Sequence, residues 1–320
     1  MKQLFATALS ALALLAAPVS ADEYPSGPIT MIVGYSAGGT SDTATRIVAE
    51  ALSEELGQPV VVENRPGAAT TVASNYVKNQ EADGYTLYAA AVSIALNPYL
   101  QPSVDYSLDD FTALSGLADV PFVLHVNKDL GVSDMDGLIE LVKSKPGEIA
   151  IGTSGAGAIN HLIAEYWKDA LGLDAIIIHY QGDAPARQDL MAGNIQMSFT
   201  AVTAAEPLVT AGKTVGIAVT SGERLESLPD LPTVAESAGL DGFSATYWMA
   251  MMAPASLPDD VRARLEEALA ALAEDDALTQ AMKERGLVKT MTDAAAVEAR
   301  LAKEEEVYGT LIEEVGITAN

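Results

Sequence analysis

The sequence predicts an α/β protein of two domains, each built on a mainly parallel β-sheet with helices on both faces. The chain has 320 residues, which is more than a single hydrophobic core usually serves. Segments typical of strands and of helices alternate almost throughout, and this alternation runs twice along the chain. No linker of low complexity separates the two runs, so we expect strands that cross directly between the domains.

The first run of alternating segments starts with an apolar stretch and a helix whose Ile47, Val48 and Ala51 share one stripe. Gly57 is expected to end that helix, because glycine readily takes the left-handed conformation found at helix ends. The expected elements in order are a strand over 29–35, a helix over 41–56, a strand over 60–63, a helix over 70–78 and a strand over 85–89.

The second run follows a looser stretch around residues 97–110. A long apolar segment over 243–253 predicts a strand that crosses between the domains, and the tail over 258–316 is expected to be nearly all helical. The elements expected before this segment are a strand over 122–126, a helix over 134–144, a strand over 148–152, a helix over 158–171, and strands over 175–179, 196–199 and 215–219 with helices between them.

The first 21 residues have the pattern of a secretory signal. Lys2 supplies the positive charge, residues 4–17 form a short apolar core, and Val19-Ser20-Ala21 places small residues at the cleavage position. The alternative is a transmembrane anchor, but that needs a longer apolar run to cross about 30 Å of hydrocarbon. We therefore expect cleavage after Ala21 and a mature chain in the periplasm that is not inserted in a membrane.

Composition limits the classes of function. The net charge of −26 argues against nucleic acid and anionic membranes as partners, and a saline habitat is one open explanation of it. The chain has no cysteine, which excludes disulfides, thiolate metal sites, cysteine nucleophiles and a lipid-modified N-terminal cysteine. Because the overall field repels anions, any anion site must be built locally.

One glycine-containing turn follows the first strand and precedes a helix. This first loop, residues 34–42, reads Gly34-Tyr35-Ser36-Ala37-Gly38-Gly39-Thr40-Ser41-Asp42. Gly38 and Gly39 allow a sharp turn and close approach of a ligand, and Thr40 or Ser41 is expected to cap the helix. The free N–H groups of the first helical turn would then bind an anion without lysine or arginine. A plain capped connection is the alternative, and Asp42 either holds the loop or receives a ligand ammonium.

A second turn of the same construction follows a strand of the second run. This second loop, residues 152–161, reads Gly152-Thr153-Ser154-Gly155-Ala156-Gly157-Ala158-Ile159-Asn160-His161. It matches a dinucleotide fingerprint only poorly, because the third glycine is missing and no acidic residue ends a strand about 20 residues on. If the two loops face each other across a cleft, they can hold a carboxylate between two helix N-termini.

The segment 34–38 also matches Gly-x-Ser-x-Gly, the nucleophile elbow of α/β-hydrolases, with Ser36 as nucleophile. That elbow normally comes after several strands, and the triad histidine comes late in the chain. Here the elbow follows the first strand, and the only histidines are His125, His161 and His179. A serine hydrolase is therefore the third hypothesis, and we expect no catalytic residue, no metal site and no cofactor.

Several short stretches, in this order and spacing, are shared with a known family. The chain resembles the tripartite tricarboxylate transporter substrate-binding proteins, also called the Bug family of periplasmic receptors, over nearly all of the expected mature chain. The stretches are Tyr24-Pro25-Ser26-Gly27-Pro28-Ile29, residues 37–42, residues 57–68 (GQPVVVENRPGA), Asp83-Gly84-Tyr85-Thr86-Leu87, residues 154–157 with His161, and residues 228–236 (LPDLPTVAE).

The resemblance implies a type II periplasmic-binding-protein fold: two Rossmann-like lobes around a ligand cleft, joined by a hinge of two strands in the manner of a venus flytrap. It divides the chain into a signal peptide (1–21), a discontinuous lobe 1 (22–124 plus 248–320) and lobe 2 (125–247). It also implies a carboxylate held between the two loops. The implied ligand-binding residues are Tyr35, Ser36, Ala37, Gly38, Gly39, Thr40, Asp42, Ser93, Thr153, Ser154, Gly157, Asn160 and Thr200.

The sequence departs from the family pattern where specificity is set. Tyr35 stands where many relatives have phenylalanine, Thr200 follows Phe199 where aspartate is frequent, and Gln181 stands where lysine is common. Residues 68–70 (Ala-Ala-Thr) replace a usual glycine pair. Arg65 is interpreted as a structural ion pair, with a distal ligand carboxylate as the alternative.

We therefore predict a monomeric solute-binding protein without enzymatic activity. Its ligand is a small organic carboxylate, which leaves di- and tricarboxylates, aromatic acids and acidic amino acids open. The resemblance implies delivery to the large and small membrane subunits of a tripartite permease. A ligand-sensing subunit for a signalling receptor is the alternative, and neighbouring genes would distinguish the two.

Overall fold

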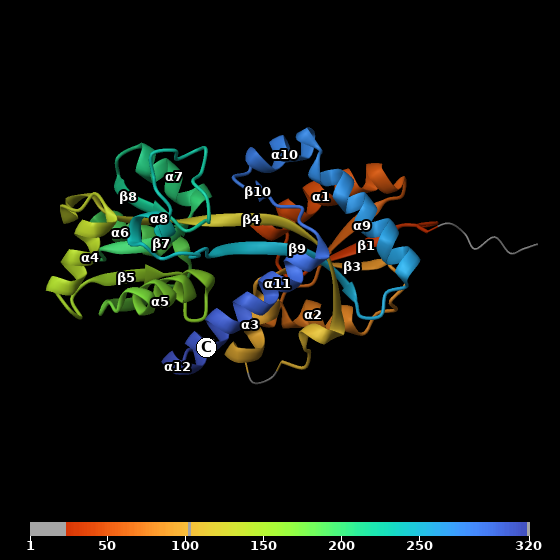
Figure 1. The fold of residues 1–320 in the computed structure, drawn as a ribbon, viewed down its shortest axis with the longest axis horizontal. Coiled ribbons are helices and arrows are strands. Elements are labelled where there is room, and N and C mark those ends of the chain that lie inside the picture. Colours follow the sequence, from red (N-terminus) through yellow and green to blue (C-terminus); the bar gives the residue numbers. More distant parts are fainter. Residues whose placement is uncertain (1–23, 102–103, 319–320) are drawn as a thin grey trace, which may run out of the picture.

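Two long strands, β4 (Phe111–Asn127) and β9 (Thr246–Pro254), run antiparallel through the middle of the molecule and connect two groups of elements (Figure 1). The computed structural model describes residues 24–101 and 104–318. The crossing strands were expected from the missing linker and from the apolar segment at 243–253. Their antiparallel pairing joins two otherwise parallel sheets into one.

We name the two groups by the division that the sequence predicts. Residues 24–124 with 248–318 are called the first lobe, and residues 125–247 the second lobe. Both lines of division fall inside strands that continue across them, since β4 spans the first line and β9 the second. The first part of β4 pairs with β9 and with the short β10 (Val288–Lys289), and its last part pairs with two strands of the second lobe.

Three parallel strands form the sheet of the first lobe in the order β2-β1-β3, and β3 then pairs antiparallel with β9. Helix α1 ends where expected, at Gly57 in the left-handed conformation with φ 65°. The strands are β1 (Ile29–Val33), β2 (Val60–Asn64) and β3 (Thr86–Ala91). The helices are α1 (Thr40–Leu56), α2 (Thr71–Lys78), α3 (Ser93–Leu100), α9 (Asp259–Ala273), α10 (Asp276–Lys283), α11 (Ala294–Glu304) and α12 (Thr310–Val315).

The second lobe has β5 in parallel pairing with β6 and β7, while β7 and β8 flank the end of β4 as antiparallel partners. Its strands are β5 (Ala150–Thr153), β6 (Ile176–His179), β7 (Met197–Ala201) and β8 (Thr214–Val219). Its helices are α4 (Met135–Ser144), α5 (Ile159–Leu171), α6 (Asp183–Ala192), α7 (Val202–Thr210) and α8 (Val234–Ala238).

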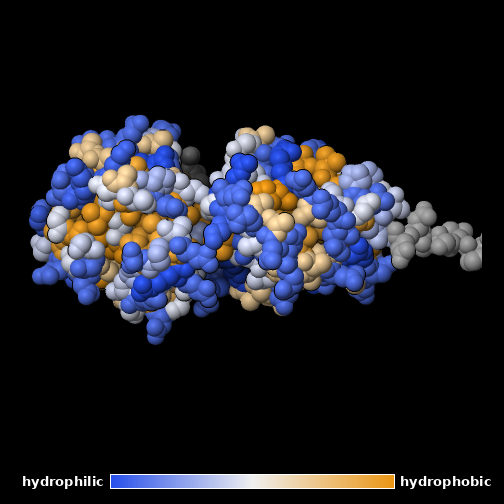
Figure 2. All heavy atoms as spheres, turned by 90° about the horizontal axis from the view of Figure 1, so that it is seen from above, coloured by the Kyte–Doolittle hydropathy of each residue, from blue (hydrophilic) through white to orange (hydrophobic). Residues whose placement is uncertain are grey.

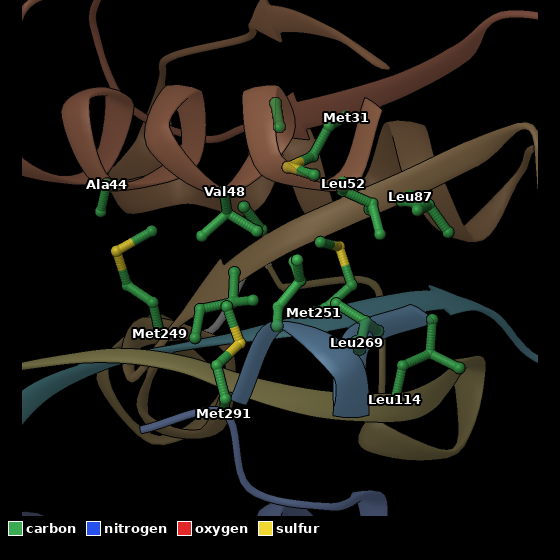
Figure 3. Packing of buried hydrophobic residues seen from close by; sticks show 14 of the residues in the cluster. Met31, Ala44, Val48, Leu52, Leu87, Leu114, Met249, Met251, Leu269 and Met291 are labelled. Atoms are coloured by element: carbon green, nitrogen blue, oxygen red, sulfur yellow. The ribbon is translucent and has the colours of Figure 1, made fainter. Parts of the chain in front are cut away.

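The core of the first lobe joins distant parts of the chain. Helix α1 turns Val48 and Leu52 toward the sheet, where Met249 and Met251 of β9 lie (Figure 3). Leu269 of α9 belongs to the same buried cluster. These side chains are buried almost completely, so their apolar surface fixes α1 and therefore the loop at its N-terminus.

Strand β4 is much longer than the predicted strand at 122–126. The missed part, residues 111–121, has only Thr112 and Val120 as β-branched residues and is interrupted by small ones, so its strand signal is weak. Small residues are needed there because Gly116 passes Thr292 so closely that a Cβ would lie 2.4 Å from its Oγ1. Register shifts against β9 occur at the same place.

The C-terminal helices lie against the crossing strands. Arg300 of α11 donates to Asp119 of β4 at 2.8 Å and to Thr246 of β9 at 2.6 Å. Glu304 accepts a hydrogen bond from the Trp248 indole at 3.0 Å, and its second oxygen, Oε2, is buried with no hydrogen-bond partner among the described residues. A π-helical turn (Glu305–Gly309) follows directly. The strands β4 and β9 and the helix α11 thus share one polar network.

The face seen from above is mainly hydrophilic, with separate hydrophobic patches and a notch between the two lobes (Figure 2). None of the helices in the described parts of the chain combines the length and the apolar composition that crossing a membrane requires. The predicted signal over residues 1–21 and its cleavage after Ala21 lie outside the described residues.

Candidate ligand-binding site

A pocket of ≈ 610 Å³ opens at the first loop, where the two crossing strands and the end of β7 meet it. Its size is within the range of small-molecule sites. Six of the predicted ligand-binding residues line it, namely Tyr35, Ser36, Ala37, Gly38, Gly39 and Thr40. The other lining residues are Ser41, Val120, Phe122, Ala201 and Tyr247.

Helix α1 begins at this pocket without the expected hydroxyl cap. The N-cap residue is Gly39, and no side chain caps the helix, so the prediction that Thr40 or Ser41 caps it is wrong. The Ser41 hydroxyl instead bonds to the Tyr247 hydroxyl at 2.6 Å. The N–H groups of Gly39, Thr40 and Ser41 have no hydrogen-bond partner among the described residues. They remain available to a ligand, at the positive end of the helix dipole.

Asp42 holds the first loop from behind. Its carboxylate accepts from the Gly38 N–H at 2.8 Å, from the Asn64 amide at 2.8 Å and from the Arg46 guanidinium at 2.9 and 3.0 Å. Burial raises the pKa of this carboxyl, but the hydrogen bonds from Arg46, Gly38 and Asn64 outweigh burial and leave the pKa lowered. With its oxygens used in this way, Asp42 holds the first loop to Asn64 and Arg46.

A chain of hydroxyl groups supports the pocket on the side of α3. The Tyr35 hydroxyl lies 3.3 Å from Ser93 Oγ, which lies 2.9 Å from Thr70 Oγ1. Ser93, predicted as a ligand-binding residue, is thus brought next to Tyr35, although it does not line the pocket. The Tyr35 ring also meets the Tyr247 ring edge-on, with centroids 6.1 Å apart.

Sequence reasoning missed the contribution of Thr70. Ala68, Ala69 and Thr70 all have positive φ (44°, 48° and 81°), a conformation that costs non-glycine residues about 1 kcal/mol or more each. The turn is held by the Asn97 amide, which donates to the Ala69 carbonyl at 2.6 Å. The only signal in the sequence was that Ala-Ala-Thr replaces a usual glycine pair.

Several polar groups of the second loop are hydrogen-bonded within the second lobe. The Ser154 N–H and hydroxyl both donate to the Asn160 side-chain oxygen, at 3.2 and 2.9 Å, and the Asn160 amide donates to the Phe199 carbonyl at 3.3 Å. The Gly157 N–H donates to His161 Nδ1 at 3.1 Å. None of the predicted residues of this loop lines the pocket at the first loop, in the parts of the chain that the structure describes.

The histidines of the second lobe are used within it. Thr153 is fully buried, and its hydroxyl lies 2.8 Å from His179 Nδ1. His161 also lies 3.7 Å from the Glu165 carboxylate and packs against the His179 ring. Desolvation, followed by the neighbouring His161, lowers the pKa of His179 against the opposing effect of Glu165. No histidine is among the described residues that line the pocket with Ser36.

Thr200 lies inside the second lobe rather than at the pocket. It is fully buried, and its hydroxyl bonds to His125 Nε2 at 2.9 Å and lies 3.3 Å from Ser198 Oγ. The other nitrogen of His125 bonds to Thr214 at 3.0 Å. Burial lowers the pKa of His125 to about 3, so the ring is neutral. The neighbouring Ala201, on the opposite face of β7, is the residue that reaches the pocket.

Two further residues were predicted to affect specificity. Arg65 pairs with Glu63 at 2.6 Å, and its guanidinium lies 3.4 Å from the centre of the Tyr76 ring, which agrees with the structural interpretation. Gln181 is exposed on the second lobe.

No group of three or more histidine, aspartate or glutamate side chains able to hold a metal occurs among the described residues.

Two α/β lobes, two crossing strands between them and a pocket where they meet define a periplasmic-binding-protein fold, as the sequence predicts. A solved periplasmic transporter shares it at a TM-score of 0.74 and 30% identity, over 93% of this chain and 100% of the other. The model of the family described as the tripartite tricarboxylate transporter family receptor matches residues 44–317. The chain therefore belongs to this family of solute-binding receptors.

Individual relatives agree with the family. The chain is 33% identical to Protein BugT of Bordetella pertussis over 96% of this chain and 94% of that protein. The structure of the periplasmic binding protein BugD has a TM-score of 0.71 at 31% identity, covering 93% of this chain and all of BugD. The structure of R. palustris Rpa4515 with adipate has a TM-score of 0.74 at 30% identity, covering 92% and 99%.

Proposed function

We propose that this protein captures a small organic carboxylate at the first loop, in the periplasm, and delivers it to a tripartite membrane permease without transforming it. The observation that carries the proposal is the group of free N–H donors at Gly39, Thr40 and Ser41, which face a pocket between two hinged lobes. Membership of a transporter receptor family supports the partnership with a permease.

Binding to the first loop is favoured by electrostatics and by rigidity. The N-terminus of a 17-residue helix attracts a carboxylate, and the buried apolar face of that helix keeps its donors in place. Asp42 fixes the turn before the ligand arrives, so little ordering remains to oppose binding. That Rpa4515, a relative of 30% identity, is seen with adipate supports an organic acid as ligand.

Closure of the lobes is the signal that the permease reads in this proposal. A ligand that contacts both lobes favours the closed arrangement over the open one. The second loop, with Thr153, Ser154, Gly157 and Asn160, meets the ligand as the lobes close, and β4 and β9 act as the hinge. The predicted signal peptide, removed after Ala21, delivers the chain to the periplasm.

The test is thermal unfolding of residues 22–320, first unfolded and refolded to remove carried-over ligand, against organic acids, sugars, amines and metal salts. A ligand at 100 times its Kd adds about 2.7 kcal/mol, which raises the midpoint by roughly 5–10 °C. A shift with carboxylates alone supports the proposal. A response confined to sugars, amines or metals contradicts it.

Asp42→Asn tests the role of the first loop in the same assay. The amide keeps the shape but loses the negative charge that holds Arg46 and Gly38, so we expect at least tenfold weaker ligand binding by calorimetry. Asp134→Asn is the matched control, because Asp134 accepts the N–H of a glycine at the same 2.8 Å but at the start of α4. Equal affinities of the two variants would remove Asp42 from the site.

A further inference from the structure

The pocket at the first loop contains no charged side chain among the described residues that line it. Its polar groups are backbone N–H groups and hydroxyls, all on or beside the first loop. The remaining lining side chains, Val120 and Phe122 of β4 and Ala201 at the end of β7, are apolar. The lining of the site therefore has its polar groups on and beside the first loop and apolar side chains on β4 and β7, which we call its apolar end.

The tyrosine hydroxyls do not change this division. The Tyr247 hydroxyl is bonded to Ser41 at 2.6 Å, and the Tyr35 hydroxyl lies 3.3 Å from Ser93. Both rings line the pocket, and burial raises the pKa of Tyr247 well above its ordinary value, so that it stays neutral. The rings thus add aromatic surface to the lining of the pocket.

The arginines closest in sequence to the first loop are engaged elsewhere. Arg46 binds Asp42 and Asn64, and Arg65 pairs with Glu63 over the Tyr76 ring. Neither lines the pocket. A second carboxylate that lies against Phe122 and Ala201 would lose hydration and find no cation among the described lining residues, which costs free energy.

We infer that the ligand is a monocarboxylate whose remaining part is apolar, either an aliphatic chain or an aromatic ring. This inference rests on the proposed function and narrows it: the single carboxylate takes the N–H groups of the first loop, and the apolar part lies against β4, Ala201 and the two tyrosine rings. The net charge of −26 acts in the same direction, because it repels a dianion more strongly than a monoanion.

Matched pairs of acids test the inference by titration calorimetry on the refolded mature chain. Hexanoate and adipate have the same length and differ only in the second carboxylate, and benzoate and terephthalate form an aromatic pair. Within a pair of acids that binds, we expect the Kd of the monocarboxylate to be at least tenfold lower than that of the dicarboxylate. Equal or tighter binding of the dicarboxylate overturns the inference and leaves the carboxylate receptor intact. No binding of any of the four acids, nor of any carboxylate in the thermal panel, contradicts the proposed function itself.

A charge-introducing variant provides a second readout. Ala201→Arg places a cation at the apolar end, so the preference should shift at least tenfold toward adipate or terephthalate. Val61→Arg is the control. Val61 is 54% exposed on the edge strand β2, so this substitution makes the same change in net charge away from the pocket. An equal shift in both variants would show that the overall charge, rather than the lining, sets the preference, and would overturn the inference.

Discussion

The first and second loops look alike in sequence but differ in how their donors are used. Both join a strand to a helix through glycine and hydroxyl residues. In the first, Asp42 takes the Gly38 N–H and leaves the next N–H groups free. In the second, Asn160 and His161 take the N–H groups of Ser154 and Gly157. Residues in the first turn of each helix therefore decide which N–H groups of the loop stay free, and in the second loop those of Gly155 and Ala156 have no partner among the described residues.

Two buried carboxyl groups also differ, in the direction in which folding shifts their pKa. Asp42 receives hydrogen bonds from three residues, and its pKa is lowered. Burial raises the pKa of Glu304 to about 7, against the opposing charge of Arg300 and the Trp248 hydrogen bond. Burial raises the pKa of both carboxyls, and the number of donors that face each one decides the net direction.

The largest expected effect comes from removing the residue that holds each loop. Asp42→Ala frees the turn that presents the donors, so ligand affinity should fall at least 100-fold. Asn160→Ala should lower the affinity less than tenfold, while the unpaired Ser154 N–H lowers the free energy of unfolding by about 1–3 kcal/mol. Calorimetry and urea unfolding measure the two quantities. Equal losses of affinity in the two variants would mean that both loops contribute equally to ligand binding.

The two carboxyls should give opposite responses to pH. Glu304 binds its proton more tightly when folded, so its stabilising contribution is complete below the unfolded pKa and is lost as pH rises through about 7. The free energy of unfolding should fall by about 2 kcal/mol between about pH 5 and 7.5, and Glu304→Gln should flatten this part of the profile. Urea unfolding across the pH range measures it.

The contribution of Asp42 runs the other way. Because its pKa is lowered by folding, its stabilisation is present above the unfolded pKa of about 4 and is lost only as pH falls below it. Asp42→Asn should therefore leave the slope between about pH 5 and 7.5 unchanged. A flattened slope in this variant, with an unchanged one in Glu304→Gln, would reverse the assignment of the two groups.

The smallest expected effect concerns the missing cap of α1. Thr40→Ala should change the free energy of unfolding by less than about 0.5 kcal/mol, because no hydroxyl caps that helix. Thr233→Ala is the matched comparison: Thr233 accepts from the Glu236 N–H at 3.0 Å in a capping box, and its loss should cost about 1 kcal/mol. A larger loss at Thr40 would mean that α1 is capped after all.

What could be predicted from the sequence follows from local rules. The alternation of elements, the end of α1 at Gly57 and the position of the first loop depend on periodicity and on glycine, and the structure confirms them. The length of β4 and the buried place of Thr200 depend on contacts with residues far along the chain, such as Thr292 and His125. No local pattern encodes those contacts.

The same long-range contacts set an order for folding. The buried cluster of the second lobe draws its members only from residues 122–245, so it can assemble from one continuous stretch of chain. The main cluster of the first lobe needs residues 29–120 together with 249–291. We therefore expect the loop that offers the ligand donors to be among the last parts to become rigid. A chain released before β9 and α9 are complete would carry a folded second lobe and an unformed binding site.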